Sequence, residues 1–95
     1  MFVHDAEAYR RAQAVITDML TTIQHDPEDP DIVWYKCTPL CNALLHEGDP
    51  AQTTFEMAGI LCTVLHGAVK DGQDPADAWR QLCLAMSEDL EDPHA

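Results

Sequence analysis

The stretch TTFEMAGILCTVLHGAVK, residues 53–70, decides the fold that this sequence predicts. Arranged as a helix, it carries apolar side chains around most of its circumference, the large ones being Phe55, Met57, Ile60, Leu61, Val64, Leu65 and Val69. Burying these side chains would contribute roughly 10 to 20 kcal/mol, and ordering the helix backbone would cancel that gain. Such a helix needs neighbours on several sides. We therefore expect a central apolar helix at residues 53–70, with Ile60, Leu61, Val64 and Leu65 in the interior.

The composition is that of one small acidic domain. Among 95 residues, 17 Asp and Glu stand against five Lys and Arg, which gives a formal net charge of -12, and 46% of the residues are hydrophobic. This hydrophobic fraction predicts a folded chain. The charge disfavours direct binding to nucleic acid or to anionic membranes, and it favours a protein partner with a basic surface. We expect a single acidic helical domain over residues 1–95.

The lengths of the apolar runs indicate the cellular compartment in which the protein is expected. The first eleven residues, MFVHDAEAYRR, contain no apolar run typical of a signal peptide. The least polar run, residues 57–69, is shorter than the ~20 residues of a membrane-spanning helix. We therefore expect a cytoplasmic protein with no membrane contact. The chain has few lysines and asparagines and much alanine, aspartate and proline, a composition that indicates a GC-rich genome. This agrees with the interpretation that the chain is phage-encoded.

Asp-Pro dipeptides mark the starts of helical segments. They occur at residues 26–27, 29–30, 49–50, 74–75 and 92–93. Aspartate is a good N-cap and proline fits the first helical position. Gly48 and Gly72 lie just before two of these starts, where a preceding helix would place a left-handed residue. The spacing predicts four helical segments that begin near residues 5, 30, 50 and 75.

The segment that begins near residue 30 is expected to break at Pro39, because proline in a helix interior costs about 3 kcal/mol. We expect a short helical turn at residues 30–36, then a helix over 39–47 with Thr38 as its N-cap. This helix should bury Leu40, Leu44 and one of Ala43 or Leu45.

The first and last helices are amphipathic. The helix at residues 5–24 should pack through Tyr9, Ala12, Ile16, Met19, Leu20 and Ile23. The helix at 75–90 should turn Trp79, Leu82, Cys83, Met86 and Leu90 inward. No segment alternates with the period of a strand. The predicted fold class is all-α, a small bundle of four main helices plus a short extra helical turn.

Cysteines are the first candidates for chemistry. Without a secretion signal, reduced thiols are expected. Cys37-x3-Cys41 and Cys62-x3-His66 each place two metal ligands one helical turn apart, and together they could form a Cys3His zinc site. The expected break at Pro39 separates the first pair, so small buried cysteines are the favoured interpretation. We expect no metal and no cofactor, with a metal or thiol site at Cys62 and His66 as an alternative.

The candidate contact surface runs from Asp26 to Tyr35. Ile32, Val33, Trp34 and Tyr35 are four consecutive apolar residues, and helical residues about 100° apart cannot all reach one core. Trp and Tyr are enriched at binding hot spots, and carboxylates would form a charged rim. The predicted protein-binding residues are Asp26, Glu28, Asp29, Asp31, Trp34 and Tyr35. In the alternative, Trp34 closes one end of the bundle and the acids are only helix caps.

The function predicted from these features is protein binding rather than catalysis. We expect an inhibitor or modulator of a cytoplasmic partner with a basic face, whose carboxylates imitate the charge of nucleic acid. The first alternative is a homodimer that completes the core of its central helix across a twofold axis. The second alternative is the Cys/His metal or thiol site.

Overall fold

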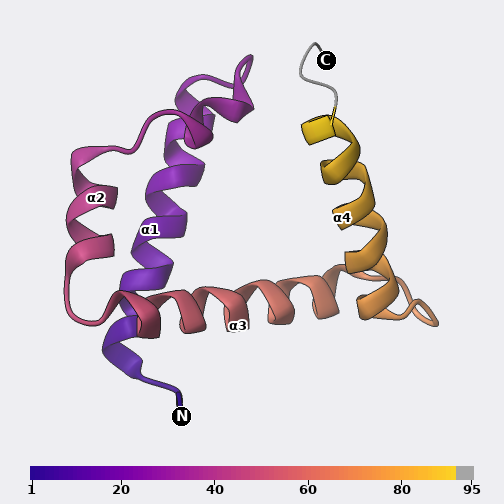
Figure 1. The fold of residues 1–95 in the computed structure, drawn as a ribbon, viewed down its shortest axis with the longest axis horizontal. Helices are drawn as coiled ribbons and strands as arrows, with labels where there is room; N and C mark the ends of the chain where they lie inside the picture. Colours follow the sequence, from indigo (N-terminus) through magenta and orange to yellow (C-terminus); the bar gives the residue numbers. More distant parts are fainter. Residues whose placement is uncertain (92–95) are drawn as a thin grey trace. The chain divides into compact units, whose positions relative to one another are not determined.

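The described residues form four α-helices and one short 3-10 helix (Figure 1). They are α1 (Ala6–His25), η1 (Pro30–Trp34), α2 (Pro39–His46), α3 (Pro50–Ala68) and α4 (Pro75–Glu91). This computed structural model describes residues 1–91, leaving aside the side chains of residues 30 and 89–91. Within that part of the chain there is no strand, and no helix is long and apolar enough to cross a membrane. The predicted all-α fold class, four main helices plus a short helical turn, is confirmed.

The chain divides into two compact units, Met1–Gly59 and Ile60–Ala95, and the boundary falls inside α3. The first unit holds α1, η1, α2 and the start of α3, and the second holds the rest of α3 and α4. The predicted contact surface therefore belongs entirely to the first unit.

The helix starts follow the predicted capping pattern. Asp5 caps α1, where its Oδ1 accepts hydrogen bonds from the backbone N–H groups of Glu7 and Ala8 at 2.9 and 3.2 Å. Thr38 caps α2, and its Oγ1 accepts from the Cys41 N–H at 3.0 Å. Asp49 and Asp74 cap α3 and α4 through the N–H of the second helical residue. The Asp49 carboxylate accepts from the Ala51 N–H at 3.0 Å, and the Asp74 carboxylate accepts from the Ala76 N–H at 3.2 Å. Side-chain capping thus fixes where these four helices begin.

The core of the first unit lies on α1. Ala8, Ala12 and Val15, spaced by four and three residues, are buried along one face of this helix. Both α2 and η1 pack against α1 (Figure 1). The small side chains of the two alanines allow neighbouring segments to come close. Of the predicted α1 stripe, Ala12 is buried, Leu20 is exposed, and the others are half-buried, namely Tyr9, Ile16, Met19 and Ile23.

The predicted interior of the segment 53–70 is wrong. In α3, Leu61 is 46% exposed and Val64 is 61% exposed, while Ile60 and Leu65 are half-buried. The buried residues of α3 are the polar Thr53 and Glu56. Among the described residues, the helices that pack on one another are α1 with α2 and α1 with η1, so these apolar side chains of α3 have no helix packed over them.

Similar corrections apply to α2 and α4. Leu40 is exposed, and the buried residue of α2 is Cys41, with Leu44 and Leu45 half-buried. Of the residues of α4 predicted to face inward, Trp79, Leu82 and Met86 are exposed and Cys83 is half-buried. The predicted inward position of Leu90 lies outside the described side chains. Amphipathic spacing identified these helices correctly, but it overestimated how much of each apolar face is covered.

Gly48 follows the C-cap residue of α2 with a φ of +62°, as its position after a helix predicted. We expect Gly48→Ala to lower the free energy of unfolding by about 1 to 2 kcal/mol, because residues with a Cβ rarely adopt this conformation. A Cβ here would also lie 2.8 Å from Nη2 of Arg11, whose Nε donates to Thr53 Oγ1 at 3.3 Å. Urea denaturation followed by circular dichroism measures the loss.

A Gly48→Asn variant is the control for this prediction. Asparagine tolerates the left-handed conformation better than alanine does, yet its Cβ meets Arg11 in the same way. We expect the asparagine variant to be more stable than the alanine variant. Equal losses in the two variants would show that displacement of the Arg11 guanidinium, rather than the backbone, sets the cost.

Candidate functional site

The segment after α1 is folded by a run of short-range backbone hydrogen bonds. The Asp29 N–H donates to the Asp26 carbonyl at 3.1 Å, and the Ile32 N–H donates to the Asp29 carbonyl at 3.2 Å. The N–H groups of Tyr35 and Lys36 then donate to the Ile32 carbonyl at 3.1 and 2.9 Å. Spacings of three residues produce a 3-10 helix. This short helix packs on α1, so its residues are held in place rather than in a free loop.

The exposed residues of this segment form what we call the η1 surface, which consists of Asp26, Glu28, Asp29, Asp31, Trp34 and Tyr35. Trp34 is 77% exposed and Tyr35 is 78% exposed, and all four acidic side chains are exposed. Ile32 and Val33 are half-buried. As expected, the four consecutive apolar residues do not all reach one core: Ile32 and Val33 are partly covered, and both aromatic rings lie on the outside.

The alternative interpretation of this segment does not fit the structure. A tryptophan that closed one end of the helices would be covered, and Trp34 is not. Asp29 is the N-cap residue of η1, but its side chain makes no capping hydrogen bond. Asp26 satisfies the end of α1 with its backbone N–H, which donates to the Ile23 carbonyl at 3.1 Å. The carboxylates of Asp26 and Asp29 are thus not used as helix caps.

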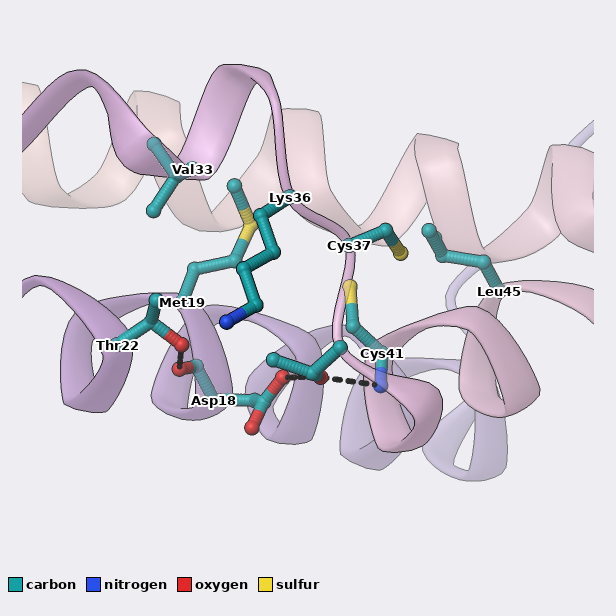
Figure 2. A pocket seen from close by; sticks show the side chains of 9 residues that line it. Asp18, Met19, Thr22, Val33, Lys36, Cys37, Cys41 and Leu45 are labelled. Atoms are coloured by element: carbon teal, nitrogen blue, oxygen red, sulfur yellow. Dashed lines mark hydrogen bonds between the residues drawn. The ribbon is translucent and has the colours of Figure 1, made fainter.

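A pocket of about 140 Å³ lies beside the η1 surface, between α1, the residues after η1 and α2 (Figure 2). It is lined by Asp18, Met19, Thr22, Val33, Lys36, Cys37, Thr38, Cys41 and Leu45. The Thr38 hydroxyl donates to the Asp18 carboxylate and accepts from the Cys41 N–H (Figure 2). One threonine therefore ties the start of α2 to α1. The sequence indicated Thr38 as a cap, but not its second bond.

Two of the four cysteines meet in this pocket. The sulfur atoms of Cys37 and Cys41 lie near one another at the wall of the pocket (Figure 2). Burial, followed by interaction with the Cys37 side chain, raises the pKa of the Cys41 thiol above its usual value. The break at Pro39 was expected to separate these residues. Instead the turn into α2 brings them together.

The four residues of the alternative Cys3His zinc site are divided between the two units, with Cys37 and Cys41 in the first and Cys62 and His66 in the second. Cys41 is buried, whereas Cys37, Cys62 and His66 are exposed, so the interpretation of small buried cysteines is wrong for Cys37 and Cys62. All four cysteines are free thiols. Across residues 1–91, no group of three or more His, Cys, Asp or Glu side chains is arranged to hold a metal ion. Cys62 and His66 remain two exposed residues one turn apart on α3.

A polar cluster that the sequence did not indicate ties the N-terminal residues to α3. The carboxylate of Glu56 accepts a hydrogen bond from the Asp5 N–H at 2.6 Å and contacts His4 Nδ1 at 2.9 Å. Gln52 Nε2 donates to the Val3 carbonyl at 2.7 Å, and the rings of Phe2 and Phe55 stack with centroids 5.5 Å apart. The Asp5 N–H is the main cause that lowers the pKa of Glu56, and His4 adds to it against the opposing effect of burial.

The lowered pKa of Glu56 makes stability depend on pH. The ionised carboxylate stabilises the fold above the ordinary glutamate pKa of about 4.3, and this contribution is lost as the pH falls through the lower pKa of the folded state. We expect Glu56→Gln to be less stable than the parent at neutral pH and the difference to shrink on acidification below about pH 4.3. Urea denaturation at a series of pH values measures it.

The exposed Glu47 provides the control, because Glu47→Gln removes one carboxylate without touching the N-terminal residues. Its difference from the parent should stay small across the same pH range. If the difference in free energy of unfolding between Glu56→Gln and the parent does not change with pH, the hydrogen-bonded carboxylate of Glu56 is not the source of the pH-dependent stability.

Comparison with models of protein families, with curated proteins and with solved structures found no match to this chain.

Proposed function

We propose that this protein binds another protein through the η1 surface and modulates or inhibits it, and that the partner presents a basic face. The observation that carries the proposal is the adjacent pair Trp34 and Tyr35, both more than three-quarters exposed and held on a helix that packs against α1. Large aromatic side chains on a rigid support lose little conformational entropy on binding, and such residues dominate interface energies. Contact residues that are already ordered before binding are well suited to a protein interface.

The charge around the aromatic pair selects the class of partner. Within residues 26–36 four carboxylates stand against one lysine, and the whole chain carries a net charge of -12. A field of this sign accelerates encounter with a cationic surface and weakens with salt. The same field opposes nucleic acid and anionic lipid. A protein face that otherwise binds nucleic acid has the required charge, which supports the interpretation of the acidic surface as a mimic of phosphate charge.

The experiment places a photo-crosslinking benzoylphenylalanine at position 35, which keeps an aromatic ring there, and irradiates the labelled protein in lysate of its source cells. The control carries the same residue at the exposed position 54 of α3. We expect one protein, with a basic surface, to crosslink from position 35 alone and to be lost at high salt. Asp29→Lys combined with Asp31→Lys should abolish that crosslink.

Binding kinetics with the purified protein and the purified partner then test the aromatic residues and the carboxylates of the η1 surface separately. Trp34→Ala should raise the dissociation rate of the identified partner about 30-fold, equivalent to about 2 kcal/mol. The Asp29→Lys/Asp31→Lys pair should mainly slow association and reduce its salt dependence. A matched control with the same change of net charge is Asp71→Lys/Glu88→Lys, at exposed positions of the second unit. Equal crosslinking from positions 35 and 54, or equal effects of the two charge reversals, would contradict the proposal.

A second candidate, self-association, is supported by a different observation. In the second unit, Leu61 and Val64 of α3 and Leu82 and Leu84 of α4 are all exposed. Leu61 and Val64, three residues apart, lie on one face of α3, and a contiguous exposed apolar patch marks an interaction site. Sedimentation velocity at micromolar concentration tests for a dimer. If a dimer forms and Leu61→Glu/Val64→Glu dissociates it, this surface joins two copies. A monomer at all concentrations contradicts the candidate.

A further inference from the structure

Cys37 and Cys41 form a pair whose members differ in exposure to solvent and in secondary structure. Cys37 is exposed and lies in the irregular connection between η1 and α2, while Cys41 is the third residue of α2 and only 5% exposed. Both side chains line the same pocket, and Figure 2 shows their sulfur atoms near one another. The other two cysteines, Cys62 on α3 and Cys83 on α4, belong to the second unit.

We propose that Cys37 and Cys41 are a dithiol site that reacts with low-molecular-weight disulfides, of which glutathione disulfide is the common example, and closes as an internal disulfide. In the first step the Cys37 thiolate attacks one sulfur of glutathione disulfide. The S–S bond of that molecule breaks, and one glutathione leaves and takes up a proton. Cys37 then carries a mixed disulfide.

In the second step Cys41 gives up its proton to solvent and its sulfur attacks Cys37 Sγ. The mixed disulfide breaks, the second glutathione leaves and is protonated, and the Cys37–Cys41 bond forms. Two electrons have passed from the protein dithiol to glutathione disulfide, which is reduced to two thiols. Excess glutathione reverses both steps, so the site follows the thiol–disulfide ratio of its surroundings.

The accessibility of the two thiols sets the order of the steps. A dissolved disulfide can reach Cys37 and cannot reach the buried Cys41. The raised pKa of the Cys41 thiol keeps this thiol protonated during the first step. Once deprotonated, a thiolate of higher pKa is the stronger nucleophile. Cys37 is therefore the attacking residue and Cys41 the resolving one.

The backbone around the pair permits closure. A disulfide requires Cα atoms about 4.4 to 6.8 Å apart and a sulfur–sulfur bond of about 2.05 Å. Cys41 is fixed in the first turn of α2 by the 3.0 Å bond from its N–H to Thr38 Oγ1, and Thr38 is held by Asp18. Residues 36–38 are in no helix, so Cys37 can approach Cys41 to this distance without breaking helical hydrogen bonds. Lys36, on the same pocket, adds a cation that favours an anionic disulfide such as glutathione's.

The experiment treats the full reduced chain with glutathione disulfide, quenches with acid, blocks remaining thiols with N-ethylmaleimide and maps each cysteine by mass spectrometry. We expect the peptide with Cys37 and Cys41 to be lighter by two hydrogens and to carry neither glutathione nor maleimide. The thiol of Cys62, which is also exposed but belongs to the second unit, should carry one or the other, and serves as the internal control. This result needs no variant, so it does not depend on any substitution being tolerated.

Two variants test the assigned order. Cys41→Ala should accumulate glutathione on Cys37, because the resolving thiol is gone. Cys37→Ala should leave Cys41 at least about tenfold slower to react than Cys37 is in the first variant, with circular dichroism confirming that both remain folded. The proposal is overturned if the parent protein holds glutathione stably on Cys37 while Cys41 stays free. It is equally overturned if Cys41 in Cys37→Ala reacts as fast as Cys37 does in Cys41→Ala.

Discussion

Replacing Val15 by alanine lowers the free energy of unfolding by about 2 to 3 kcal/mol, because two buried carbon atoms are removed at about 0.8 kcal/mol each and a cavity adds to that cost. Val15 is 2% exposed and lies on the face of α1 that carries the core of the first unit. The measurement is urea denaturation of the parent and the variant under identical conditions, followed by circular dichroism.

Leu61→Ala is the matched comparison and removes a larger side chain. Leu61 is 46% exposed, so its truncation forfeits little buried area and should change the free energy of unfolding by no more than about 0.5 kcal/mol. On the sequence alone the expectation for Leu61 is the reverse, since it belongs to the most apolar helix of the chain. An equal loss at the two positions would contradict a core centred on α1 and would mean that Leu61 is covered in solution.

The contrast between Val15 and Leu61 shows which parts of the fold the sequence could predict. Helix positions depend on local chemistry, and Asp5, Thr38, Asp49 and Asp74 stand at the starts where capping rules place them. Burial depends on how many neighbours each helix finds, and apolar periodicity does not report that number. The sequence therefore predicted a central role for the most apolar helix, α3, whereas the core of the first unit lies on α1.

The same limit applies to polar residues. Glu56 lies within the apolar segment 53–70 and gave no sign of being buried, because its partners His4 and Asp5 are about 50 positions away in the chain. The η1 surface could be predicted from Trp34 and Tyr35, because four consecutive apolar residues on one helical turn cannot all face inward. The pocket with Cys37 and Cys41 could not, because it needs the approach of α1 and α2.

Thr38→Val is the second substitution with a large expected effect. Valine keeps the shape and the β-branch of threonine but has no hydroxyl. The variant loses the N-cap bond to the Cys41 N–H, at a cost of about 0.5 to 2 kcal/mol, and it loses the donor to the Asp18 carboxylate. A hydrogen bond to a charged group contributes more than a neutral one, although Asp18 is only half-buried and water can replace part of it. We expect a total loss of about 2 kcal/mol.

Thr38→Ser is the control for that prediction, because serine retains the hydroxyl that both caps α2 and donates to Asp18. Its free energy of unfolding should lie within about 0.5 kcal/mol of the parent.

The two variants also test whether the Thr38 hydroxyl protects the neighbouring thiol of Cys41. Without the Thr38 hydroxyl the first turn of α2 frays, Cys41 becomes accessible to N-ethylmaleimide, and its alkylation rate should rise in Thr38→Val but not in Thr38→Ser. If valine is tolerated as well as serine and Cys41 stays protected, then packing of α2 on α1, and not the Thr38 hydroxyl, holds the start of this helix in place.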